Sequence, residues 1–492
     1  MTLVPLEIPA GAYRNGTDME QSGRWRDVNL VRWRDGSLRP VGGWRVRAAT
    51  AYTGTPRGIL AWEDLSGDRR VGVGTFSNLY VTNASGTTFD ITPAGLTVGE
   101  EVATVNTGYS GGFFGSSFYG TERQDTGNYA EATTWSVDNW GENLVACSSA
   151  DGVIYEWTLN TGTPAAAVVN APVDNLAMMV TAERFLFALG AGGNPRLVQW
   201  SDREDNTTWL ASDLNEAGDL ELQTAGQIMC GIQVRGQALI LTDQDAHTAT
   251  YQGPPFVYDF ERVGQSCGII ARKAIATVDA GAFWMGQEGF FAYSGGAVQE
   301  LPCDIADYIF SDLNRAQQSL IHAVPMAQHG EIWFFYPSGS ANECDRYVAL
   351  DYKEGHWTFG QIERTCGVQR GVFKYPLWCD ASGNLWEHEV GLNYGGASIF
   401  AESGPISIGA GDQVMKATSL IPDEITQGDV SATFKTRFHP NDVEREYGPY
   451  SMANPTDVRF TGRQVRMRVD GERLANWRVG VMRLEVTPGG RR

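Results

Sequence analysis

The sequence predicts an all-β protein: a β-propeller with a C-terminal β-strand domain and an extended N-terminal segment. Among 492 residues, 58 glycines, 11% aromatic and only 20% charged residues favour strands and tight turns over long helices. A motif also recurs, in which an apolar strand is followed by a turn of Gly, Asp, Ser or Asn and then by an apolar residue and an aromatic. Several of its intervals are roughly 50 residues long, which is within the range of propeller blades.

The N-terminal segment, residues 1–47, contains a strip dense in Trp, Arg and Gly at residues 23–45, called here the N-terminal strip. Arginine offers planar, multi-donor contacts and tryptophan a large rigid area, and both are enriched at interface hot spots. We therefore predict a docking segment whose interface residues are Arg24, Trp25, Arg26, Arg32, Trp33, Arg34, Arg39, Trp44 and Arg45. The alternative is a surface strand and turn with solvated arginines.

The propeller is predicted over residues 48–405. The repeated turn occurs at 77–80, 151–155, 288–291 and 382–386. In a four-stranded blade, such a turn joins two strands and the following aromatic packs into a neighbouring blade. Three strands at 331–337, 347–352 and 356–359 form the clearest single blade, and a short amphipathic helix within 304–318 is expected to link blades. Unrelated hairpins in a sandwich remain the alternative.

A Gly-rich stretch at 391–411 separates the propeller from the C-terminal β domain, residues 406–492. Longer alternating strands are expected there at 430–438, 457–460, 464–469 and 477–486. In the third strand, period two places Arg466 and Arg468 on one face and Val465, Met467 and Val469 on the other. In the fourth, Arg483 falls on the apolar side, so a bulge or strand end is expected. The domain should have a basic face.

The net charge of -20 is unevenly distributed. Residues 1–47 carry +3 and residues 457–492 carry +5, so the remaining middle carries -28. An acidic body would repel phosphate, and basic ends would dock on acidic partners, although solubility alone also accounts for acidity.

The sequence shows no pattern of catalytic or cofactor chemistry. The seven cysteines are scattered without a Cys-x-x-Cys pair, which predicts free thiols and neither a disulfide framework nor a zinc site. The six histidines form no metal motif, and no phosphate-binding Gly-rich loop is present. We predict no enzyme activity, no cofactor and no metal. No apolar window long enough for a membrane span occurs, and the N-terminus lacks the features of a signal peptide.

The segment from Ile8 to Arg45 resembles the opening of tail nozzle, or packaged DNA stabilisation, proteins of short-tailed bacteriophages. The resemblance rests on Ile-Pro-Ala-Gly-Ala-Tyr-Arg-Asn-Gly-Thr at 8–17 and Asn-Leu-Val-Arg-Trp-Arg-Asp-Gly at 29–36, and it is diffuse elsewhere. It implies a structural protein of the virion tail, made in the host cytoplasm. The implied partners are the head-to-tail adaptor ring, further copies in a homo-hexameric ring, and tail fibres or spikes. Double-stranded DNA would be retained and then conducted at genome ejection without specific binding.

A second interpretation is a carbohydrate-binding or glycan-hydrolysing propeller used in host attachment. The turns at 149–157 and 380–386 partly resemble the Asp-box turns of sialidase propellers, which are structural in that family. Tryptophans on blade loops would then stack on sugar rings. A third interpretation is a scaffolding propeller with a cellular partner.

Overall fold

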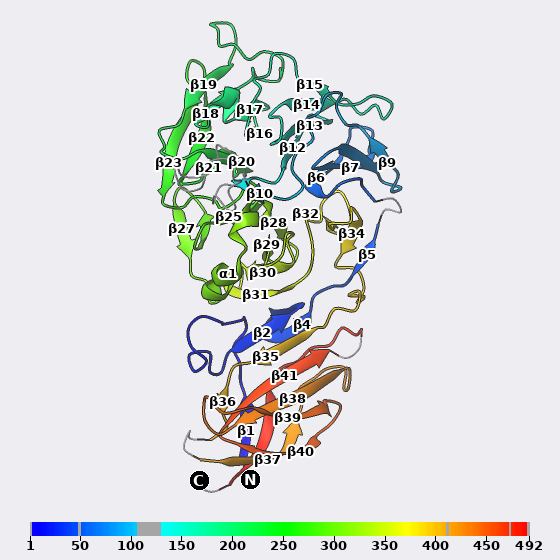
Figure 1. The fold of residues 1–492 in the computed structure, drawn as a ribbon, viewed down its shortest axis with the longest axis vertical. Helices are drawn as coiled ribbons and strands as arrows, with labels where there is room; N and C mark the ends of the chain where they lie inside the picture. Colours follow the sequence, from blue (N-terminus) through cyan, green and yellow to red (C-terminus); the bar gives the residue numbers. More distant parts are fainter. Residues whose placement is uncertain (1, 48–50, 106–128, 410–412, 472–473, 490–492) are drawn as a thin grey trace, which may run out of the picture.

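The computed structural model describes residues 2–47, 51–105, 129–409, 413–471 and 474–489. Strands dominate throughout, so the predicted all-β class is confirmed. The molecule is elongated, with a ring of small sheets at one end, a two-sheet sandwich at the other, and both chain termini at the far end of the sandwich (Figure 1). Among the described residues, no helix has the length and hydropathy needed to span a membrane.

Seven four-stranded antiparallel sheets, here blades 1 to 7, make up the ring. Blade 1 is β6 (Pro56–Glu63), β7 (Arg69–Thr75), β8 (Leu79–Asn83) and β9 (Thr88–Asp90). Blade 2 is β12 (Trp135–Trp140), β13 (Asn143–Ser148), β14 (Ile154–Trp157) and β15 (Ala166–Ala167). Blade 3 is β16 (Ala177–Val180), β17 (Leu186–Leu189), β18 (Leu197–Trp200) and β19 (Gly218–Glu221). Blade 4 is β20 (Ile228–Val234), β21 (Gln237–Thr242), β22 (Asp245–Gly253) and β23 (Val257–Gln265).

Blade 5 is β24 (Ile275–Val278), β25 (Gly281–Met285), β26 (Phe290–Tyr293) and β27 (Val298–Leu301). Blade 6 is β28 (His322–Met326), β29 (Glu331–Tyr336), β30 (Arg346–Asp351) and β31 (His356–Gln361), which confirms the three strands predicted there. Blade 7 is β32 (Cys366–Val368), β33 (Leu377–Cys379), β34 (Leu385–His388) and, from the other end of the chain, β5 (Trp44–Val46). The innermost strands contact one another in the order β6, β12, β16, β20, β24, β28, β32 and back to β6. This closed ring is the arrangement of a β-propeller.

Packing between blades depends on aromatic side chains that fill the adjoining sheet. Trp135 of β12 lies against two glycines of blade 1, and its indole Nε1 donates to Thr75 O at 2.7 Å. A Cβ atom at Gly74 would lie 2.4 Å from Trp135 Cγ, so only glycine leaves room for the ring. Tyr80 and Tyr155, the aromatics of two predicted turns, pack with residues of blades 7 and 1, respectively. The predicted contact with a neighbouring blade is confirmed for both.

Short elements connect the blades. The two-stranded β10 (Thr104–Val105) and β11 (Tyr129–Ala130) lies between blades 1 and 2, and a 3-10 helix, η1 (Ala191–Gly193), lies within blade 3. The helix predicted between blades 5 and 6 is α1 (Ala306–Asp312), followed by the 3-10 helix η2 (Arg315–Leu320). The break occurs because the Asn314 side chain accepts from Ala316 N and starts a new turn.

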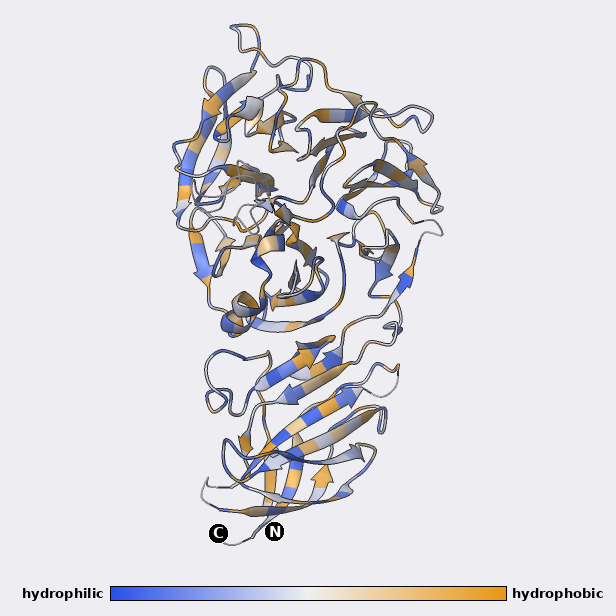
Figure 2. Cartoon of the chain, viewed as in Figure 1, coloured by the Kyte–Doolittle hydropathy of each residue, from blue (hydrophilic) through white to orange (hydrophobic). Residues whose placement is uncertain are grey.

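The sandwich packs two sheets face to face. One sheet is β1 (Thr2–Leu6), β42 (Met482–Pro488), β37 (Met415–Ile421) and β40 (Thr456–Gly462). The other is β2 (Trp25–Asn29), β35 (Phe400–Ser403), β41 (Gln464–Gly471), β38 (Val430–Arg437) and β39 (Arg445–Ser451), with β36 (Ile406–Ser407) also paired to β41. Hydrophilic and hydrophobic residues alternate along these strands (Figure 2). Phe434 and Phe460 meet between the sheets with ring centroids 5.0 Å apart.

Strand pairing divides the chain differently from the predicted segments. In place of a separate segment 1–47, the N-terminus supplies β1 and β2 to the sandwich and β5 to blade 7, while the hairpin of β3 (Val31–Arg34) and β4 (Ser37–Pro40) lies at the junction (Figure 1). β35 already belongs to the sandwich before the predicted boundary at 406. The last strand begins at Met482, beyond the predicted start at 477, and Arg483 is exposed.

Candidate functional site

The N-terminal strip is folded into the molecule. Trp25 and Trp33 are 5% and 2% exposed, and their ring centroids are 6.1 Å apart. The edge of the Trp33 ring meets His356 of blade 6 at 6.0 Å. These two tryptophans were predicted to contact a partner, and the structure instead places them in the core between the propeller and the sandwich. Both strands lie between the propeller and the sandwich, and in β3 the residues on both faces, Val31, Arg32 and Trp33, are buried.

Arg32 forms the centre of a buried ionic cluster that sequence analysis had also assigned to an external interface. Its Nε lies 2.8 Å from Glu331 Oε1, and its Nη2 lies 2.7 Å from Glu389 Oε1. Trp333 Nε1 donates to Glu331 Oε2 at 2.8 Å, and Gly42 N donates to Glu389 Oε2 at 2.9 Å. One guanidinium therefore joins blade 6, the segment after blade 7 and the N-terminal hairpin.

The cluster is shielded from water, which makes its charges interdependent. Burial alone would raise the pKa of Glu389, but Arg32 and His329 together hold it well below its ordinary value. Burial likewise opposes the charge on Arg32, and the two carboxylates nevertheless raise the pKa of its guanidinium. Removing Arg32 would leave the two buried carboxylates without their guanidinium partner.

The other members of the strip differ in exposure. Arg24 pairs with Asp304 at 3.1 Å, Arg26 with Asp18 at 3.2 Å, and Arg39 with Asp35 at 3.8 Å. Trp44 is half-buried against His388 and Tyr394. Arg34 and Arg45 are the exposed members of the predicted set, although Arg45 also pairs with Glu387 at 2.8 Å. Most predicted interface residues of the strip therefore make contacts within the chain, as an internal brace between the propeller and the sandwich. Only Arg34 and Arg45 are exposed.

The predicted basic face of the C-terminal strands is largely covered by the chain itself. Val465, Met467 and Val469 point into the sandwich as predicted, each at most 1% exposed. On the opposite face, Arg466 and Arg437 both contact the carboxylate of Asp18, Arg437 at 2.5 Å, and Arg466 Nε lies 3.1 Å from Glu444. Arg468 pairs with Asp470 at 2.9 Å. These arginines anchor the N-terminal loop to the sandwich.

The centre of the propeller contains a cavity of about 380 Å³. All seven innermost strands, or the residues just before them, contribute to its wall. Its charged lining residues are Arg57, Asp138, Arg272 and Lys273, with His322 beside them. Arg57 is paired with Glu343 at 2.8 Å and Arg272 with Glu131, whereas neither carboxylate lines the cavity itself.

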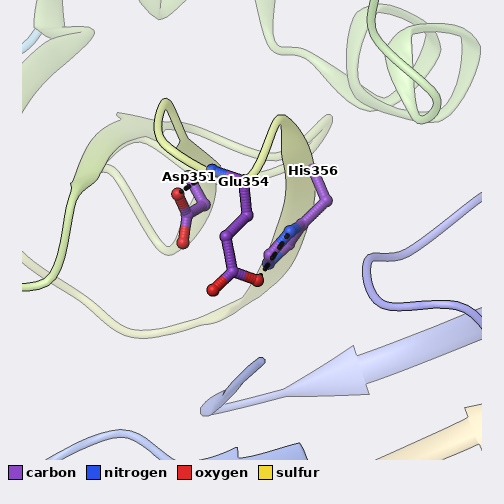
Figure 3. A group of neighbouring side chains, drawn as sticks. All are labelled: Asp351, Glu354 and His356. Atoms are coloured by element: carbon purple, nitrogen blue, oxygen red, sulfur yellow. Dashed lines mark hydrogen bonds and ion pairs between the residues drawn. The ribbon is translucent and has the colours of Figure 1, made fainter. Parts of the chain in front are cut away.

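One group among the described residues has the composition of a metal site. The ligand atoms of Asp351, Glu354 and His356 lie within 4.8 Å of one another at the turn between β30 and β31 (Figure 3). The Asp351 carboxylate already accepts from the backbone amides of Lys353 and Glu354, and a Glu354 oxygen accepts from Asp35 N at 3.2 Å. These bonds give the group a role in shaping the turn. The seven cysteines are unpaired, as predicted.

Sequence analysis did not identify Glu331, Glu389 or Lys273. The two glutamates are separated from Arg32 by about three hundred residues and lie in no recognisable motif. A signal existed for Lys273, because the chain has only five lysines and this one precedes an apolar strand. Arg272 directly precedes it, and two adjacent cations beside a buried strand are an unusual arrangement.

Comparison with known proteins gives no family assignment. No protein-family model and no curated protein sequence matches the chain. Among solved structures, virginiamycin B lyase from Staphylococcus aureus is 9% identical with a TM-score of 0.43, and the match covers 70% of this chain and 99% of that one. BamB from Moraxella catarrhalis is 8% identical with a TM-score of 0.38, covering 73% of this chain and 94% of that one. Similarity at this level identifies no shared function.

Proposed function

We propose that this chain is a structural virion protein: a tail nozzle or hub subunit that forms a ring below the portal and adaptor, retains packaged DNA and conducts it at ejection. The proposal comes from the resemblance of residues 8–45 to that family. The observation that supports it is the position of this segment, which joins the propeller to the sandwich through Arg32, Trp25 and Trp33. These contacts join the propeller and the sandwich into one elongated subunit. A subunit of an assembly that transmits force would need such a connection.

The propeller centre is not a suitable path for duplex DNA. A volume of about 380 Å³ is that of a small-molecule pocket. Its wall also contains Lys273, whose ammonium has no ion-pair partner among the described residues, and an unpaired cation binds phosphate. In this proposal the DNA conduit is therefore enclosed between copies of the chain, with the acidic surface of the body facing it.

The burial of the tryptophans argues against the carbohydrate-binding alternative. A sugar-stacking platform needs an exposed ring face. All fifteen tryptophans lie within the described ranges; Trp44 and Trp386 are partly exposed and the rest are buried. Asp138 is the only carboxylate lining the central cavity among the described residues, whereas glycoside hydrolysis ordinarily uses two.

The test combines particle composition with a surface variant. Quantitative mass spectrometry of purified particles of the encoding phage should find the chain at a ring-like copy number relative to the portal protein. In the variant Arg34→Ser/Arg45→Ser, incorporation should fall while the free subunit keeps its unfolding midpoint, because both side chains are exposed. Arg262→Ser/Arg370→Ser, which removes two exposed arginines of the propeller, is the matched control.

Absence of the chain from particles would remove the nozzle proposal. Normal incorporation of the Arg34/Arg45 variant would instead exclude these two arginines as docking contacts and leave the virion role to be decided by the copy number alone.

A further inference from the structure

The cavity at the propeller centre has the size and lining of a binding site for a small molecule. Its volume is about 380 Å³, within the roughly 300–1,000 Å³ typical of ligand pockets. Apolar side chains from several blades form much of its wall: Ile59, Met178, Met179, Ile232, Ile275 and Leu320. The cavity is independent of the N-terminal strip and of the proposed virion role.

Lys273 lines this cavity. It lies just before β24, and its backbone is fixed on blade 6 because Lys273 O accepts from Ala323 N at 2.8 Å. Its ammonium group interacts electrostatically with Cys230, Asp138 and Cys366, which belong to blades 4, 2 and 7. A side chain that reaches groups on three other blades must point toward the ring axis.

The Lys273 ammonium is the unpaired charge of the cavity. The guanidinium of Arg57 is neutralised by Glu343, and that of Arg272 by Glu131. The ammonium group of Lys273 makes no hydrogen bond or ion pair with any residue of the described ranges. Asp138 is too distant to form one, and its two oxygens accept from the backbone amides of Asn139 and Val180.

The Cys230 thiol does not supply the counter-charge for Lys273. Burial raises the pKa of Cys230 to about 12, so its sulfur is a neutral thiol at physiological pH. Burial also lowers the pKa of Lys273 below its ordinary value, since nothing close compensates the ammonium. Buried charges in proteins are ordinarily paired, and an unpaired one in an open cavity attracts an anion.

We propose that the propeller centre binds a small organic anion with a single carboxylate, which pairs with Lys273 Nζ while its apolar part contacts the isoleucine and methionine side chains of the wall. A monoanion fits because Lys273 is the one cation of the cavity wall without an ion-pair partner among the described residues. A polyanion would leave charge unpaired near Asp138.

The first test labels amines in the intact wild-type protein. Glyoxylate is an aldehyde with a single carboxylate that forms an imine with a neutral amine, and borohydride reduction followed by peptide mass spectrometry locates it. Lys353, Lys374 and Lys416 are exposed and serve as internal controls. Near pH 7.5, Lys273 should be labelled faster than these three, because the cavity holds the carboxylate of the aldehyde beside its amine and burial lowers the pKa of that amine. Labelling of Lys273 no faster than the exposed lysines would overturn the proposal.

The second test identifies the charge requirement. Benzoate should slow the labelling of Lys273 in a saturable manner, and the uncharged analogue benzyl alcohol at equal concentration should not. By calorimetry, Lys273→Met should bind benzoate about tenfold to a hundredfold more weakly than the wild type, the range expected for one charge-assisted hydrogen bond. Equal protection by benzoate and benzyl alcohol would show an apolar cavity without an anion site. Because the labelling experiment uses wild-type protein, it decides the question even if the variant folds poorly.

Discussion

Arg32→Met should destabilise the folded chain by about 3–5 kcal/mol, the cost of leaving a buried carboxylate without its partner. The arginine side chain is 8% exposed, and Glu331 and Glu389 are 4% and 13% exposed, so water cannot replace the lost guanidinium. Methionine keeps most of the apolar stem of the arginine. The loss of unfolding free energy therefore measures the removal of the charge and not the creation of a cavity. Urea unfolding followed by circular dichroism measures the difference.

Arg45→Met is the matched control. Arg45 belongs to the same strip and pairs with Glu387 at 2.8 Å, but its side chain is 61% exposed, and Arg47 remains beside the same glutamate. Its loss should cost no more than about 1 kcal/mol, as for exposed ion pairs. The variant Arg32→Met/Glu331→Gln/Glu389→Gln should recover much of the stability, since it removes the unpaired charges. If Arg32→Met lowered the free energy of unfolding by less than about 1 kcal/mol, the argument that the cluster is shielded from water would be refuted.

The same cluster predicts a pH signature. The pKa of Glu389 is lowered by folding, so its contribution to stability is fully present above the unfolded value of about 4.3 and is lost as the pH falls toward the folded value. In Arg32→Met the largest cause of that lowering is absent, and only His329 remains. The difference in stability between the two proteins should therefore shrink as the pH falls below about 4.

Three further variants test other parts of the fold. Gly74→Ala should destabilise the propeller by about 1–3 kcal/mol because the added methyl meets the Trp135 ring, whereas Gly371→Ala, which meets nothing within 4 Å, should be neutral in the same urea assay. His322→Phe should flatten the pH dependence of stability between about 4 and 6.5. Burial lowers the pKa of this histidine to about 4, so the wild type loses stability as the unfolded chain takes up a proton in that window, and a variant with the same slope would contradict the assignment. Asp18→Asn should speed hydrogen exchange in residues 13–24 by weakening their anchor on the sandwich arginines, with exchange in blade 4 as the unchanged reference.

The Arg32 cluster and the central cavity show which features of a site can be predicted from the local sequence and which cannot. The strip at residues 23–45 was correctly recognised as unusual, because its Trp and Arg content is visible in the sequence itself. Its role as an internal brace was missed for Arg32, since an arginine that pairs inside the chain looks the same in sequence as one that binds a partner. The location of Lys273 at the ring axis was equally hidden, because it depends on where seven separate strands converge.

The sequence alone was sufficient for the all-β class, the three outer strands of blade 6 and the inward face of β41, because apolar periodicity and turn residues act within a few positions of one another. Tertiary structure alone decided that β5 closes blade 7 and that β1 and β2 complete the sandwich. Every exposed strand edge offers the same backbone donors and acceptors. The residues of one strand therefore do not determine which other strand it pairs with. It is set by which pairing buries Trp25 and Trp33 and brings Arg32 to Glu331 and Glu389.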